Sequence, residues 1–77
     1  MRHWLKKLRG DTSEQDIANK LGITQQYYHL IETGKRQKKM ELALCEKIAK
    51  VFNLSVHKIV DFEIERMQAE QTDTETS

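Results

Sequence analysis

Apolar residues recur every three or four positions along nearly the whole chain, and no segment alternates apolar and polar residues over the length of a strand. Such spacing gathers apolar side chains on one face of an α-helix, because the helix has 3.6 residues per turn. The pattern therefore predicts an all-α fold. Since the chain has only 77 residues, it predicts a single small core and leaves no room for a deep substrate cleft.

Capping residues and glycines divide the pattern into five expected helices, at about residues 2–9, 13–21, 25–33, 40–52 and 55–61. A Ser or Thr oxygen accepts a hydrogen bond from the first turn of a helix, so Thr12 or Ser13, Thr24 and Ser55 are expected N-caps. Gly22 and Gly34 are expected to end the second and third helices. The side chains expected in the core are Trp4, Leu5, Leu8, Ile17, Ala18, Leu21, Tyr28, Ile31, Leu42, Cys45, Ile48, Ala49, Phe52, Val56, Ile59 and Val60.

Charge is distributed unevenly along the chain. Residues 1–60 hold twelve Lys and Arg against six Asp and Glu, whereas residues 61–77 hold one Arg against six acids. A basic body with an acidic tail suggests a polyanionic partner, although a solvated surface with a solubilising tail gives the same pattern. We expect a domain over residues 1–61 and a C-terminal extension over residues 62–77. Within the extension, Phe62, Ile64 and Met67 either lengthen the last helix or form a separate short amphipathic segment, and disorder is expected from Gln68 onward.

Several classes of protein are not expected from this sequence. The single cysteine, Cys45, cannot form an internal disulfide, which favours the cytoplasm, and no apolar run is long enough to span a membrane. His3, His29, Cys45 and His57 lack the spacing of metal ligands, so neither a metal nor a cofactor is expected. No catalytic set or phosphate-binding loop stands out, so the chain is not expected to be an enzyme.

Two short helices joined by a tight turn with one glycine are the parts of a helix-turn-helix. Ala18 is small where the two helices must cross closely, Gly22 suits the turn, and Ile23 can fill the space beneath it. Tyr28 and Ile31 lie on the face of the second helix that must pack on the core. Each residue alone is common, but all five at this spacing strongly indicate the motif.

The segment that holds these residues reads SEQDIANKLGITQQYYHLIETGKR, and it resembles the helix-turn-helix of the phage repressor and Cro superfamily, the xenobiotic-response-element type of bacterial regulator. The later segment EKIAKVFNLSVHKIV is similar to the last two helices of those domains. The resemblance covers about residues 4–61 and implies a five-helix fold like that of the lambda repressor. Glu14 stands where the family usually has a glutamine that contacts phosphate, and Leu30 where many members have a polar or basic residue.

The resemblance implies that the protein is a sequence-specific regulator of transcription, in the first instance a repressor. Its implied partners are an operator in double-stranded DNA and a second copy of the chain. In such domains the second helix of the motif enters the major groove, and glutamine can form two hydrogen bonds with adenine. The implied base-reading residues are Gln25, Gln26, His29 and Leu30. The implied phosphate-binding residues are Thr24, Tyr27, Lys35, Arg36, Lys38 and Lys39. Similar domains also pair an Arg of the first helix with the Glu that closes this helix, which implies an Arg9–Glu32 ion pair.

Apolar residues beyond the needs of a five-helix core are candidates for a dimer surface, namely Val60, Phe62, Ile64 and Met67. The same residues would also suit a C-terminal helix that folds back on its own core. An alternative function remains open, in which the chain is an antitoxin or regulatory adaptor that acts mainly through a protein partner, with the acidic tail as a possible contact. A pure adaptor would tolerate the loss of Gln25 and Gln26.

Overall fold

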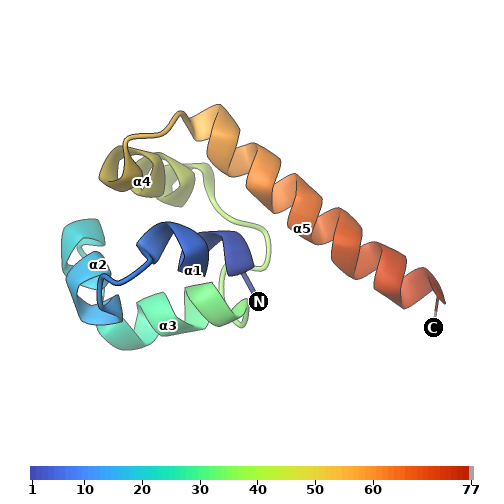
Figure 1. Ribbon diagram of the computed structural model, residues 1–77, viewed down its shortest axis with the longest axis horizontal. Helices are drawn as coiled ribbons and strands as arrows, with labels where there is room; N and C mark the ends of the chain where they lie inside the picture. The colour runs from blue at the N-terminus through green and yellow to red at the C-terminus, as the bar shows by residue number, and fades with distance from the viewer. Residues whose placement is uncertain (77) are drawn as a thin grey trace.

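The computed structural model describes residues 1–76 of the chain, with side chains through residue 69. Within this range the chain forms five α-helices, which are α1 (His3–Arg9), α2 (Glu14–Leu21), α3 (Gln25–Thr33), α4 (Leu42–Phe52) and α5 (Val56–Thr76). Helices α1 to α4 surround the core, and α5 runs past α4 and extends away from the body (Figure 1). The predicted all-α, five-helix fold is confirmed.

Three of the predicted N-caps explain where helices begin. Ser13, Thr24 and Ser55 each accept a hydrogen bond through the side-chain oxygen from the backbone N–H three residues later, at 3.1 Å in all three cases. These bonds satisfy donors that have no partner inside the helix, which fixes the first turns of α2, α3 and α5. Of the two residues considered for the start of α2, the cap is Ser13.

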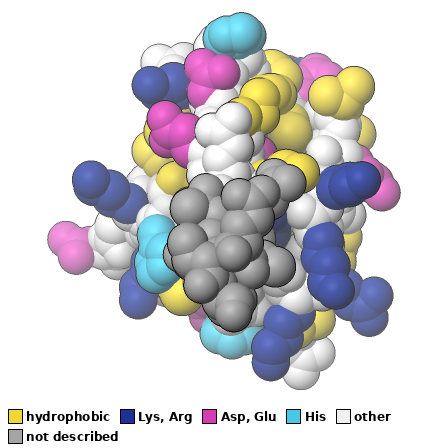
Figure 2. Space-filling view, turned by 90° about the vertical axis from the view of Figure 1, so that its right-hand side faces the viewer, with side chains coloured by type: hydrophobic (Ala, Val, Ile, Leu, Met, Phe, Trp, Pro, Cys, Tyr) yellow, Lys and Arg dark blue, Asp and Glu magenta, His cyan; other side chains and the backbone are white. Residues whose placement is uncertain are grey.

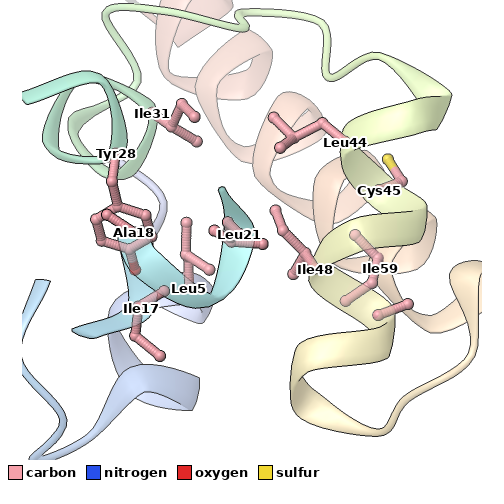
Figure 3. Close-up of a cluster of buried hydrophobic side chains, with 11 residues drawn as sticks. Leu5, Ile17, Ala18, Leu21, Tyr28, Ile31, Leu44, Cys45, Ile48 and Ile59 are labelled. Carbon is pink, nitrogen blue, oxygen red and sulfur yellow. The ribbon is translucent and has the colours of Figure 1, made fainter. Parts of the chain in front are cut away.

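The core gathers side chains from all five helices. Leu5 of α1 and the inward residues of α2 and α3 converge on Leu44, Cys45 and Ile48 of α4 and on Ile59 of α5 (Figure 3). Burying an aliphatic side chain fully contributes about 1.5–3 kcal/mol to folding, so the largest aliphatic contributions come from the fully buried Leu5, Ile31, Ile48 and Ile59. The core holds α2 and α3 against the rest of the molecule.

Two residues predicted to face the core are exposed instead. Leu42 has 74% of its surface exposed and Val56 has 37%, so both predictions were wrong. The reason is local: α4 begins at Leu42 after the N-cap Glu41, two residues later than expected, and Val56 is the first residue of α5. First-turn residues at these positions project past the edge of the core.

Helix α5 extends past residue 61, so Phe62, Ile64 and Met67 lengthen the last helix, which was one of the two alternatives. It continues through Thr76 in place of the disorder expected from Gln68 onward, and Ser77 lies outside the described residues. Gln, Ala and Glu are good helix formers, and propagating an existing helix costs far less than starting one. The domain boundary predicted after residue 61 falls inside α5, and Glu63 beyond it is only 6% exposed.

Candidate nucleic-acid interface

The turn between α2 and α3 sets the angle at which α3 leaves the body. Gly22 has φ +74° and ψ +29°, a left-handed conformation that costs glycine little. The next backbone N–H, that of Ile23, donates to the carbonyl of Ala18 at 3.0 Å and closes the end of α2. Ala18 is 1% exposed, and Ile23 packs against the core as expected. The predicted helix-turn-helix is therefore present.

The first turns of α3 present polar side chains to solvent. Gln25, Gln26 and His29 are exposed, and Leu30 is half-buried beside them. Together with Glu14 of α2, they line a shallow hollow of about 430 Å³. The structure thus brings all four predicted base-reading residues to one exposed surface, which we call the reading surface (Glu14, Gln25, Gln26, His29 and Leu30).

The Glu14 carboxylate and the His29 ring form a hydrogen bond across that surface. Oε2 of Glu14 lies 3.0 Å from Nδ1 of His29, and the two side chains are 23% and 58% exposed. A hydrogen bond from Nδ1 to the carboxylate leaves Nε2 as the second polar atom of the ring. This pair joins α2 to α3, and the sequence analysis did not foresee it.

Four of the predicted phosphate-binding residues follow α3 directly. Lys35, Arg36, Lys38 and Lys39 are all exposed and belong to the segment between α3 and α4. We call residues 35–39 the basic loop. On the face shown in Figure 2, Lys and Arg side chains gather along the lower right edge of the molecule. A concentration of cations at one edge attracts a polyanion.

The other two residues predicted to bind phosphate, Thr24 and Tyr27, have structural roles in the chain. Thr24 is exposed and caps α3 through Oγ1, which leaves its hydroxyl hydrogen available for donation. Tyr27 is half-buried against the core, and its hydroxyl oxygen accepts a hydrogen bond from Nε2 of Gln37 at 2.8 Å. Tyr27 therefore connects α3 to the basic loop.

The predicted Arg9–Glu32 ion pair is confirmed. Nε and Nη2 of Arg9 each lie 3.0 Å from a carboxylate oxygen of Glu32, and the hydroxyl of Tyr28 donates to the same carboxylate at 2.7 Å. Burial would raise the pKa of Glu32, but the hydrogen bonds from Arg9 and Tyr28 outweigh it and hold this pKa below its usual value. Burial and the neighbouring carboxylate raise the pKa of Tyr28. The pair fastens α1 to the end of α3.

The four predicted dimer residues divide between two sides of α5. Phe62 stacks on Trp4 of α1, with ring centroids 5.3 Å apart and planes 16° from parallel. Val60, Ile64 and Met67 instead line a hollow of about 250 Å³ beside α4. Ile64 and Met67 are 47% and 40% exposed. Phe62 thus packs within the chain, and the exposed apolar side chains lie on the other side of the helix.

The sequence analysis did not identify three residues that lie at or next to the basic loop, namely Arg2, Glu63 and Arg66. Arg2 and Arg66 donate hydrogen bonds to backbone carbonyls of the loop, and both pair with Glu63. Arg2 and Glu63 lie 61 residues apart in the chain, so no local pattern connects them.

The described residues contain no group of three or more His, Cys, Asp or Glu side chains that could hold a metal ion. Among the helices of the described part, none combines the length and the apolar character that crossing a membrane requires.

Comparison with known proteins gives one result. A family model described as helix-turn-helix matches residues 5–59, which is most of the chain and includes α2, the turn and α3. No curated protein and no solved structure matches the chain. The match agrees with the resemblance in sequence and with the five-helix architecture, so the chain belongs to the Cro/C1-type helix-turn-helix family of DNA-binding regulators.

Proposed function

We propose that the protein is a sequence-specific transcriptional repressor that reads the major groove of an operator with α3. The proposal rests on one observation: the exposed polar side chains of α3 and the exposed cations of the basic loop are neighbours. Exposed amide and imidazole groups stand at the start of α3, and four exposed cations follow its end. In helix-turn-helix proteins, the N-terminal residues of the second helix contact base edges.

Gln25, Gln26, His29 and Leu30 are the proposed base-reading residues. A glutamine amide can bond both N6 and N7 of adenine, and each such pair contributes about 1–3 kcal/mol of discrimination against a wrong base. Leu30, half-buried at the edge of the hollow, offers apolar contact for a thymine methyl group.

The proposed phosphate-binding residues are Thr24, Tyr27, Lys35, Arg36, Lys38 and Lys39. Their role is to fix the register of α3 on the duplex and to supply affinity that does not depend on sequence. Thr24 and the N–H groups at the start of α3 suit an anion, because the helix dipole is positive there.

A dimer fits this function, since two copies can occupy the half-sites of a palindrome one helical turn apart. We place the dimer surface on Val60, Ile64 and Met67, with Phe62 behind them on the side of α5 that packs on α1. Bound to an operator in the cytoplasm, such a dimer would block polymerase. Control through abundance or a protein partner suits so small a chain better than an inducer pocket.

Selection of bound duplexes from a randomised DNA pool tests the proposal. We expect one enriched motif, arranged as a palindrome if the dimer is correct. If the protein binds DNA but enriches no motif, and binding disappears as salt rises, the base-reading role is wrong. Absence of DNA binding would favour the alternative of an antitoxin or adaptor, and a search for protein partners would follow.

A further inference from the structure

We infer that Arg2, Glu63 and Arg66 are positioning residues for DNA binding: they hold the backbone of the basic loop so that its cations face the phosphates. This inference rests on the proposed function. It concerns residues outside the reading surface, two of which lie on α5, beyond the family match.

Arg2 is the centre of the arrangement. Its side chain is fully buried, and every one of its five N–H donors has a partner. Nη1 donates to the carbonyls of Ile31 at 2.6 Å and Arg36 at 3.1 Å. Nη2 donates to the carbonyl of Gln37 and to Glu63, and Nε donates to Glu63 at 3.1 Å. Arg2 therefore joins the end of α3, the basic loop and α5.

Glu63 holds the two arginines in place. Its carboxylate accepts hydrogen bonds from Arg2, from the indole N–H of Trp4 at 2.9 Å, and from Nε of Arg66 at 3.0 Å. Burial would raise the pKa of Glu63, but the bonds from Arg66, Arg2 and Trp4 outweigh it and keep this pKa below its usual value. The carboxylate is therefore charged at neutral pH and orients both guanidinium groups.

Arg66 extends the contact along the loop. While its Nε bonds to Glu63, its Nη2 donates to the carbonyl of Lys38 at 2.9 Å. With the bonds from Arg2, the carbonyls of three consecutive loop residues are held by guanidinium groups. We call Arg2, Glu63 and Arg66 the arginine clamp.

The middle of the loop is fixed from a second direction. Gln37 has φ +55°, a left-handed conformation uncommon for a residue with a side chain. Its amide donates to the hydroxyl of Tyr27 at 2.8 Å and accepts from the backbone N–H of Glu41 at 3.1 Å. The loop thus has a defined shape without glycine or proline among residues 35–39.

This shape serves phosphate binding in two ways. The loop carbonyls carry partial negative charge, and the clamp keeps three of them bound to the protein while the four cationic side chains stay exposed. A loop that is already ordered also loses less conformational freedom on binding. Because two clamp residues belong to α5, displacing α5 would release the loop.

Two substitutions with opposite effects on net charge test the inference. Glu63→Gln removes a negative charge, so electrostatics alone would strengthen DNA binding, whereas loss of the clamp would weaken it. Arg66→Gln removes a positive charge and the bond to Lys38. We expect both variants to bind a selected duplex about 10-fold less tightly, with the slope of log K against log[salt] smaller by about one per lost phosphate contact.

Glu32→Gln is the matched control, because it breaks a comparably buried ion pair that bonds to none of the three loop carbonyls. We expect it to lower the melting temperature without changing the salt slope. Circular dichroism establishes that each variant folds, and Arg66→Gln tests the clamp even if loss of Glu63 unfolds the chain.

Backbone ¹⁵N relaxation of the free protein supplies a readout without DNA. We expect order parameters at residues 36–38 to fall from about 0.85 to below about 0.6 in both clamp variants, and not in Glu32→Gln. Unchanged order parameters would overturn the clamp itself. Tighter binding by Glu63→Gln would overturn its role in DNA binding even if the loop loosens. Failure of the wild type to bind DNA would instead overturn the proposed function, and the positioning role with it.

Discussion

At the scale of single residues, two glutamates near α3 differ in what surrounds them. Glu32 is buried, receives hydrogen bonds from Arg9 and Tyr28, and connects α1 to α3. Glu14 is partly exposed and forms a hydrogen bond with His29 on the reading surface. A carboxylate there would repel the phosphates of a duplex bound to this surface.

Replacing Glu14 with Gln should strengthen DNA binding by about 3- to 10-fold, because it removes a negative charge from the reading surface and keeps the size of the side chain. Titration of a fluorescent duplex measures the change. Asp16→Asn is the control, since Asp16 is exposed on the same helix but does not line the hollow. Weaker binding by Glu14→Gln would mean that the carboxylate itself contacts a base.

The lowered pKa of Glu32 predicts how stability depends on pH. The unfolded chain takes up the proton at a higher pH than the folded chain does, so the pair stabilises the fold above the ordinary Glu value of 4.5. That contribution is lost as the pH falls through the folded pKa. Urea unfolding should show a steep loss of stability below about pH 4.5 and a smaller loss in Glu32→Gln. Equal pH profiles would contradict the account.

At the scale of the helices, Thr24 combines a structural and a proposed binding role. Thr24→Ala should cost about 1 kcal/mol of stability, because the start of α3 loses its cap, and it should also weaken DNA binding. Ser55→Ala removes a cap of the same geometry from α5, away from the reading surface. It should cost similar stability and leave DNA affinity unchanged. Equal DNA affinities for the two variants would contradict a phosphate contact at Thr24.

Helix α5 packs within the chain on one side and exposes apolar side chains on another. On one side Phe62 stacks on Trp4, while on another side Ile64 and Met67 are exposed and line a hollow that Glu63 also borders. If the exposed side forms the dimer, Ile64→Glu should be a monomer by light scattering at concentrations where the wild type is a dimer. It should stay folded, because Ile64 is not part of the core. A monomeric wild type would contradict the dimer.

At the scale of the whole molecule, the sequence predicted features that depend on neighbours in the chain. Helix starts at Ser13, Thr24 and Ser55 depend on a hydrogen bond three residues away. The left-handed turn depends on Gly22, and the common exposure of Gln25, Gln26 and His29 follows from helical spacing. Much of the fold and the composition of the reading surface were therefore predictable.

Features that depend on distant contacts were not predictable in this way. The clamp joins Arg2 to Glu63 across 61 residues, and the left-handed Gln37 follows no turn pattern. The exposure of Leu42 depends on the residue at which α4 begins, and the spacing of the apolar residues alone does not determine that residue. The Glu14–His29 pair depends on the angle between two helices.

The central claim is that Gln25 and Gln26 read bases, and a comparison of specificity tests it most directly. The ratio of affinities for a selected duplex and a scrambled one is measured for the wild type, for Gln25→Ala/Gln26→Ala, and for the control Gln68→Ala on α5. The account predicts that the double substitution reduces the ratio at least about 30-fold, because two pairs at the low end of about 1 kcal/mol each contribute about 2 kcal/mol, while the control leaves the ratio unchanged. A ratio that survives the loss of both glutamines would contradict the claim.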